Sequence, residues 1–135
     1  MNGLSLPPVV LIVDDNVLTL LYIKEFLKTL GCDAQTLADG ADVVETVKTC
    51  RPVLVLMDLY MPGISGFDAA RRLKADAATK DIPVYAFTAL EPLKLADNPD
   101  MKLFSGVLPK TSGIESLKRI LETVGAIPTQ KNSIA

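Results

Sequence analysis

Histidine and tryptophan are absent from the 135 residues of the chain, and cysteine occurs only twice, at Cys32 and Cys50. The absence of histidine excludes catalysis by an imidazole and any metal site with imidazole ligands. The two cysteines form no Cys-x-x-Cys pair, which predicts two small buried hydrophobic side chains in a reducing compartment. A reactive or metal-binding site in this chain must therefore be built from other groups.

Long apolar runs are also missing, although 49% of the residues are hydrophobic. No run reaches the roughly 18 residues that a membrane-spanning helix needs. The N-terminal letters MNGLSLPP contain no basic segment followed by an apolar one, so no signal peptide is predicted. The net charge is −2 and the basic residues are dispersed, whereas nucleic acid binding needs a clustered basic face. We expect a cytoplasmic protein that binds neither membranes nor nucleic acid directly.

The length fits one domain, predicted over residues 7–125, with a flexible tail over 126–135 and no output domain. Within this domain, short β-branched runs alternate with segments whose apolar residues recur at helical spacing. The predicted strands cover residues 9–13, 33–37, 53–57, 82–88 and 106–109, and the predicted helices cover residues 16–31, 39–50, 67–76, 91–106 and 112–125.

The sequence predicts particular features for two of these helices. The segment 91–106 contains the step Asn98-Pro99, which should end or kink a helix, so we expect an irregular fourth helix. The segment 16–31 shows the pattern of a helix with one side against a core. Its apolar residues at helical spacing are Leu18, Leu21, Tyr22, Phe26 and Leu30.

The alternation of strands and helices predicts an α/β fold: a doubly wound parallel sheet with helices on both faces and right-handed crossovers. In such sheets, binding sites lie beyond the carboxyl ends of the strands. Five polar residues follow or close predicted strands and should therefore meet at one edge of the sheet. They are Asp14 and Asp15 after the first strand, Asp58 after the third, Thr88 at the end of the fourth and Lys110 after the fifth.

Three carboxylates in one crevice repel one another. At about 4 Å each pair costs roughly 1 kcal/mol in water and ~4 kcal/mol at an effective dielectric constant near 20. Oxygen ligands without histidine or cysteine favour a hard cation, Mg²⁺ or Mn²⁺. A metal ion, the ammonium of Lys110 and the hydroxyl of Thr88 are the groups expected around a phosphoryl group, with Asp58 as its nucleophile.

The motifs VLIVDDN, LMDLYMPGISGFDAARRLK and FTA, with the lysine of LPK, resemble the receiver domain of two-component response regulators from about Val9 to Val124. The resemblance implies a five-stranded, flavodoxin-like sheet of order 2-1-3-4-5. It also implies that Asp58 accepts a phosphoryl group from a histidine kinase or a histidine phosphotransfer protein. The chain would then be a signalling switch rather than an enzyme, acting through a downstream protein or a phosphorelay.

The same resemblance implies roles for individual residues. Asp15, Asp58 and the backbone carbonyl of Tyr60 would hold Mg²⁺, and Asp14 would act through a metal-bound water. The phosphoryl oxygens would be bound by Thr88, Ala89 and Lys110, and Thr88 would move toward them. In the family, the positions of Tyr60 and Leu90 tune the access of water to the phosphate. Both side chains are bulky here, which predicts slow self-dephosphorylation.

Three departures from the family pattern concern its usual signalling surface. Val107 stands where the family has a switch aromatic, three residues before the lysine. Thr111 follows Lys110 in place of proline, so we expect a trans bond and a different path for the last loop. The Asn98-Pro99 step interrupts the fourth helix. Because that helix contributes to a common dimer surface, we expect a monomer, with a weak dimer as the alternative.

Other functions remain open at this point. The chain could be the receiver of a hybrid histidine kinase, or a receiver-like interaction module that no longer uses phosphate. A dehalogenase-like phosphohydrolase also uses a strand-end aspartate, but it needs a second acid two residues later, where this chain has Tyr60. A dinucleotide-binding domain is disfavoured because VDDN replaces the glycine-rich turn.

Overall fold

Five parallel strands form one sheet in the computed structural model, which describes residues 6–129 apart from the side chain of Pro92. The order is β2-β1-β3-β4-β5, so the predicted fold class and strand order are confirmed. The more polar β2 is an edge strand. The strands are β1 (Val9–Val13), β2 (Asp33–Leu37), β3 (Leu54–Met57), β4 (Val84–Thr88) and β5 (Gly106–Pro109).

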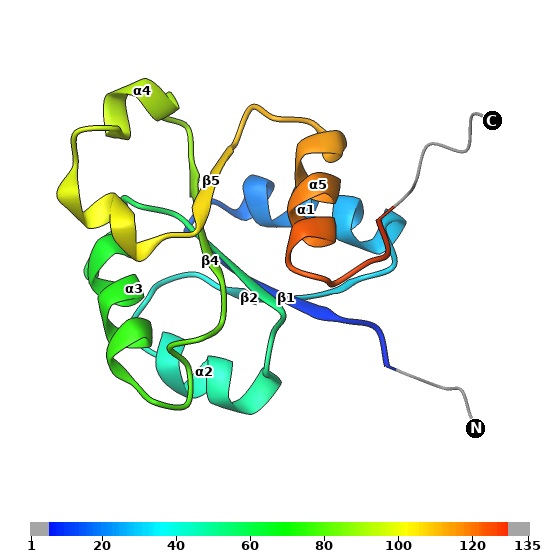
Figure 1. Cartoon of the computed structure of the whole chain (residues 1–135), viewed down its shortest axis with the longest axis horizontal. Helices are drawn as coiled ribbons and strands as arrows, with labels where there is room; N and C mark the ends of the chain where they lie inside the picture. Colours follow the sequence, from blue (N-terminus) through cyan, green and yellow to red (C-terminus); the bar gives the residue numbers. More distant parts are fainter. Residues whose placement is uncertain (1–5, 130–135) are drawn as a thin grey trace.

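Helices cover both faces of this sheet (Figure 1). One face packs against α1 (Val17–Thr29) and α5 (Ile114–Thr123), whose buried side chains share a cluster with Val10 and Ile12. The other face packs against α2 (Val43–Cys50) and α3 (Gly66–Ala75). Neighbouring residues of a strand point to opposite faces, so β1, buried except at Val9, and the fully buried β3 both contribute to the two clusters. These two central strands are therefore the rigid base of the sheet edge where the predicted site lies.

The fourth helix is irregular, as predicted. It consists of α4 (Pro92–Leu95), only four residues long, followed by the 3₁₀ helix η1 (Pro99–Leu103). Asn98 lies between them, and its side chain accepts a hydrogen bond of 2.9 Å from the backbone N–H of Asp100. Pro99 cannot donate a backbone hydrogen bond, so the chain starts a new helical turn here instead of continuing α4.

The core-facing side of α1 differs from the pattern expected from the sequence. Leu18 and Leu21 are 75% and 55% exposed. The buried side of α1 consists of Thr19, Ile23 and Leu27. The helix has apolar residues around most of its circumference, so spacing alone did not select the side that meets the sheet. The other three residues of the expected set, Tyr22, Phe26 and Leu30, are half-buried against the same core.

Both cysteines are free thiols, but they are not equally buried. Cys32 lies in the core, as expected, whereas Cys50 at the end of α2 is only half-buried. Burial raises the pKa of both thiols, which keeps them in the unreactive protonated form. Within residues 6–129, no helix is long and apolar enough to span a membrane.

A close backbone approach fixes the start of α3 next to the end of β3. A Cβ atom on Gly66 would lie 2.0 Å from the carbonyl oxygen of Asp58, far inside van der Waals contact. The N–H of Gly66 donates to the carbonyl of Leu59 at 2.9 Å, which holds the two segments together. Only glycine fits here without a backbone shift, and the shift would displace Asp58.

Replacing Gly66 with alanine should lower the free energy of unfolding by about 2–3 kcal/mol, because the new methyl group overlaps backbone atoms that cannot move aside cheaply. Urea denaturation measures this change. Gly113→Ala is the matched control, since a Cβ there meets no atom within 4 Å and the backbone has φ −83°. Equal stabilities of the two variants would contradict the close approach.

Candidate functional site

Two aspartates are held side by side by the ladder of the sheet itself. The N–H of Asp14 donates to the carbonyl of Leu37 at 2.9 Å, and the N–H of Asp58 donates to the carbonyl of Val13 at 2.9 Å. Because β1 and β3 are neighbours, both acids emerge at the same edge. Asp14, Asp15 and Asp58 each offer a carboxylate oxygen within 4.8 Å of the others.

The three acids differ in their exposure to solvent. Asp14 is fully buried, Asp58 is 6% exposed and Asp15 is exposed. Oδ1 of Asp14 accepts a hydrogen bond of 2.9 Å from the N–H of Asn16. Its Oδ2 is buried and, among the described residues, receives no well-aligned hydrogen bond, although the Nζ atom of Lys110 lies 2.7 Å away. The only close polar partner of this oxygen among the described residues is therefore the Lys110 ammonium.

Lys110 is the cation that the acids share. Its Nζ atom lies 2.7 Å from Oδ2 of Asp14 and 3.5 Å from Oδ2 of Asp58. The same Nζ atom lies 5.5 Å from the centre of the Phe87 ring, within the range of a cation–π contact. Burial lowers the pKa of Lys110, but the two carboxylates outweigh it and raise the pKa overall. The ammonium therefore stays charged at the centre of the site.

The ionisation of Asp58 is strongly perturbed by its surroundings. Its pKa is raised to about 6, first by burial and then by the negative charge of Asp14. The Lys110 ammonium and the backbone N–H of Tyr60, which donates to Oδ1 of Asp58 at 3.4 Å, offset part of this rise. A cation placed between the acids would relieve both the desolvation and the repulsion.

The end of β4 approaches the site through its backbone. Thr88 is buried, and its carbonyl accepts a hydrogen bond of 2.7 Å from the N–H of Lys110. The Thr88 hydroxyl accepts a hydrogen bond of 3.1 Å from the N–H of Leu90, which is half-buried. Ala89, between them, is exposed. Thr88 is thus linked to Lys110 on one side and to the segment leading into α4 on the other.

The predicted site residues do not all lie together. Tyr60 is 58% exposed, and its ring makes an edge contact with Phe67 at 6.1 Å between centroids. Val107 pairs with Ala86 on the edge strand β5 and packs against the cluster on the face covered by α2 and α3. It lines a small apolar pocket with Leu95, Ala96, Met101 and Gly106. No cis peptide bond occurs between residues 6 and 129, so the predicted trans bond after Lys110 is confirmed.

Sequence reasoning missed three residues that support the site. Asn16 caps α1, and its side chain accepts a hydrogen bond of 3.2 Å from the N–H of Thr19. Phe87 lies beneath Lys110. The hydroxyl of Tyr22 donates to the carbonyl of Lys110 at 2.9 Å. Asn16 could have been found as a helix cap directly before Val17, whereas the contacts of Phe87 and Tyr22 depend on the tertiary fold.

The donor set of the crevice fits a hard divalent cation. All three side chains offer carboxylate oxygens, and one of these oxygens is buried without a well-aligned hydrogen bond. Mg²⁺ prefers oxygen ligands and commonly takes only one or two carboxylates from a protein. Asp14, Asp15, Asp58 and the nearby backbone after β3 could hold such an ion.

Comparison with known proteins points to one family. The response regulator receiver domain family matches residues 10–122. The polar-differentiation response regulator DivK of Brucella anthropi is 32% identical over 84 residues, which cover 62% of this chain and 68% of DivK. The autoinducer 1 sensor kinase/phosphatase LuxN of Vibrio harveyi is 32% identical over 114 residues, 84% of this chain but only 13% of LuxN.

A solved structure resembles the fold over nearly the whole described chain. It is the receiver domain of a sensor histidine kinase from Pseudomonas aeruginosa, with a magnesium ion coordinated in its active site cleft. The TM-score is 0.80 at 27% sequence identity, and the alignment covers 88% of this chain and 98% of the other.

Asp58 should make the stability of the metal-free protein depend on pH. Its pKa is about 6 in the folded protein against 3.8 for the unperturbed group, so the folded state holds this proton more tightly. The ionised carboxylate therefore destabilises the fold increasingly as the pH rises from about 4 through 6. In buffer with a chelator, Asp58→Asn should raise the free energy of unfolding by on the order of 2 kcal/mol at pH 8.

This gain should largely disappear near pH 4, where Asp58 is protonated in the folded state and close to half protonated in the unfolded state. Urea denaturation at pH 4, 6 and 8 tests it. Asp97→Asn, at an exposed acid, is the control and should show no such trend. A gain for Asp58→Asn that is the same at pH 4 and pH 8 would show that ionisation is not its cause.

Proposed function

Because this chain belongs to the response regulator receiver domain family, we propose that it is a phosphorylation switch whose phosphoacceptor is Asp58. The observation that carries this proposal is the Lys110 ammonium, which lies within 3.5 Å of a carboxylate oxygen of both Asp14 and Asp58. Folding alone does not require a buried cluster of like charges around one cation. A transferring phosphoryl group does require fixed positive charge at this point.

In the proposed reaction, a carboxylate oxygen of Asp58 attacks the phosphorus atom of a phosphohistidine on a histidine kinase or phosphotransfer protein. A P–O bond to Asp58 forms, and the P–N bond to the donor imidazole breaks. The electron pair of the broken bond stays on the leaving nitrogen of the donor. The rigid end of β3 holds Asp58 for this attack, and Lys110 and the Thr88 hydroxyl bind the phosphoryl oxygens, with Ala89 beside them.

Magnesium is the proposed cofactor, with Mn²⁺ as an alternative. Asp15, Asp58 and the backbone carbonyl of Tyr60 would hold it, and Asp14 would act through a metal-bound water. When bound, the ion neutralises the clustered carboxylates and draws charge from the phosphoryl oxygens. Asp14 also keeps Lys110 in place through the 2.7 Å ion pair.

A protein is the proposed phosphodonor because the site is bordered by exposed apolar side chains. Val17, Leu18 and Leu21 on the first turns of α1 are all more than half exposed, and Val17 follows Asp15 by only two residues. Patches of exposed apolar side chains commonly mark surfaces where a protein binds another protein. We propose that a kinase or phosphotransfer protein of the cytoplasm covers this part of α1 while its phosphohistidine reaches Asp58.

The output is proposed to be a contact with a downstream protein or a further phosphorelay step, with the chain as a monomer. The match to a segment of LuxN favours a second form of the same proposal, in which such a receiver works within a longer sensor kinase. Val107 favours a different alternative, an interaction module that does not use phosphate. The pairing of Lys110 with both acids supports the phosphate-dependent form over this module.

Incubation with Mg²⁺ and acetyl phosphate should add one phosphoryl group to the wild-type chain and none to Asp58→Asn, because only the wild type has a carboxylate nucleophile at position 58. Intact mass spectrometry over time measures the adduct. Asp97→Asn is a matched control that removes an exposed acid and should be labelled like the wild type. Absence of both the adduct and Mg²⁺ binding in the wild type would overturn the proposed function.

The phosphorylated form should lose its phosphoryl group slowly. The bulky side chains of Tyr60 and Leu90 are proposed to restrict the approach of the attacking water. Tyr60→Asn should shorten the lifetime several-fold, since the shorter polar side chain admits and orients water. The decay of the same mass signal after removal of acetyl phosphate gives the lifetime, and an unchanged value would mean that Tyr60 only packs against Phe67.

A further inference from the structure

The backbone of Lys110 is held on both sides of its α-carbon. Its N–H donates to the carbonyl of Thr88 at 2.7 Å, in register with β4. Its carbonyl accepts a hydrogen bond of 2.9 Å from the hydroxyl of Tyr22, which lies 88 residues earlier in the chain. The first bond continues the sheet. The second bond comes from a side chain of α1 and is not one of the backbone hydrogen bonds between strands.

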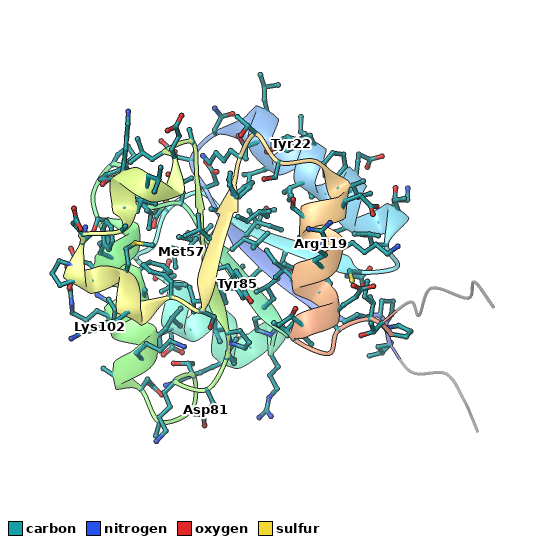
Figure 2. All side chains as sticks on the ribbon, turned by 45° about the horizontal axis from the view of Figure 1, so that its top comes forward. Tyr22, Met57, Asp81, Tyr85, Lys102 and Arg119 are labelled. Atoms are coloured by element: carbon teal, nitrogen blue, oxygen red, sulfur yellow. The ribbon has the colours of Figure 1, made fainter. Side chains whose placement is uncertain are left out.

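Tyr22 is itself well fixed for this contact. It is half-buried on α1, and its ring makes an edge contact with Phe26, with centroids 5.6 Å apart. Figure 2 shows Tyr22 next to the loop that follows β5. Burial raises the pKa of the Tyr22 phenol, so its hydroxyl remains a proton donor throughout the neutral range. The donor is therefore placed by the helix rather than by a mobile loop.

The contact falls where the strand ends and the chain turns into the loop before α5. Lys110 follows the last residue of β5, and Thr111 after it is exposed. Thr111 lacks the ring that would fix its φ angle if it were proline. The next turn is tight, because the N–H of Ser112 donates to the carbonyl of Pro109 at 2.9 Å. The Tyr22 bond fixes the plane of the Lys110–Thr111 peptide within this turn.

The position of the Lys110 ammonium depends on that peptide. A lysine side chain is long and flexible, so a small rotation of its backbone moves the Nζ atom by a large amount. Here the Nζ atom must lie between Oδ2 of Asp14 and Oδ2 of Asp58, at 2.7 and 3.5 Å. Misplacement of about 1 Å is enough to weaken an aligned reaction strongly.

We propose that Tyr22 is a positioning residue for phosphoryl transfer, and that its hydroxyl holds the Lys110–Thr111 peptide so that the Lys110 ammonium stays between Asp14 and Asp58. This inference rests on the proposed function of the site. In this proposal Tyr22 acts through Lys110 alone, by its hydrogen bond to the Lys110 carbonyl.

Tyr22→Phe tests the inference because it removes one oxygen atom and keeps the ring contact with Phe26. With saturating Mg²⁺, the initial rate of phosphorylation by acetyl phosphate should fall about three- to tenfold, the range expected for one lost hydrogen bond. The affinity for Mg²⁺ should not change, because the acids are untouched. A purely structural role would lower stability without this split between rate and metal affinity.

Tyr85→Phe is the matched control. Tyr85 lies on β4 opposite Gly106, the first residue of β5, whereas Lys110 follows its last residue. Its variant loses the same oxygen atom and should be phosphorylated at the rate of the wild type. A double variant tests whether Tyr22 acts through Lys110. In a Lys110→Met background, Tyr22→Phe should not lower the phosphorylation rate further, because the ammonium that Tyr22 positions is absent.

Each outcome decides a different question. If the wild type is phosphorylated and Tyr22→Phe reacts at the same rate, the inference is overturned and the proposed function stands. If Tyr22→Phe slows the Lys110→Met variant as much as it slows the wild type, Tyr22 does not act through Lys110 and the inference again fails. If the wild type takes up no phosphoryl group and binds no Mg²⁺, the proposed function itself falls, and the inference falls with it.

Discussion

The repulsion between buried carboxylates at the end of β1 and β3 is the constraint around which the site is organised. Asp14 and Asp58 are brought together by backbone hydrogen bonds of the sheet, so they cannot separate without breaking the ladder between the central strands. At effective dielectric constants near 20, one such pair at about 4 Å costs ~4 kcal/mol. The fold tolerates the pair because Lys110 contacts both acids.

This arrangement leaves the site charged but incomplete. One lysine offsets part of a three-acid cluster, and Asp58 keeps a raised pKa of about 6. A divalent cation is positive and a phosphoryl group is negative. If both bound, the cation would offset the charge of the carboxylates and the phosphoryl oxygens would pair with the Lys110 ammonium. The repulsion between the acids would thus be relieved by the two ligands of the proposed function, a divalent cation and a phosphoryl group, which is the physical link between the sheet and the proposed switch.

The alternation of strand and helix patterns was sufficient for the parallel sheet and for the convergence of the acids, because the carboxyl ends of parallel strands meet at one edge. The strand order came instead from the resemblance of the motifs to receiver domains. The sequence did not show which side of α1 packs against the sheet, because apolar residues lie on most sides of this helix. In the structure Ile23 and Leu27 are buried, whereas Leu18 and Leu21 are exposed. The contact between Tyr22 and Lys110 was also out of reach. It joins residues 88 positions apart and depends on how α1 is rotated.

The way in which phosphorylation would be read out follows from the bonds of Thr88. Its hydroxyl accepts from the N–H of Leu90, so a hydroxyl that turned toward a phosphoryl group would release that N–H. Leu90 leads directly into α4, which has only four residues and is followed by the break at Asn98. Val107 offers no large ring to move in response, but it lines a pocket with Leu95 and Met101 beneath this segment. If phosphorylation turned Thr88 in this way, the short α4 would be the first element affected, and the pocket lined by Leu95 and Val107 would be the surface altered.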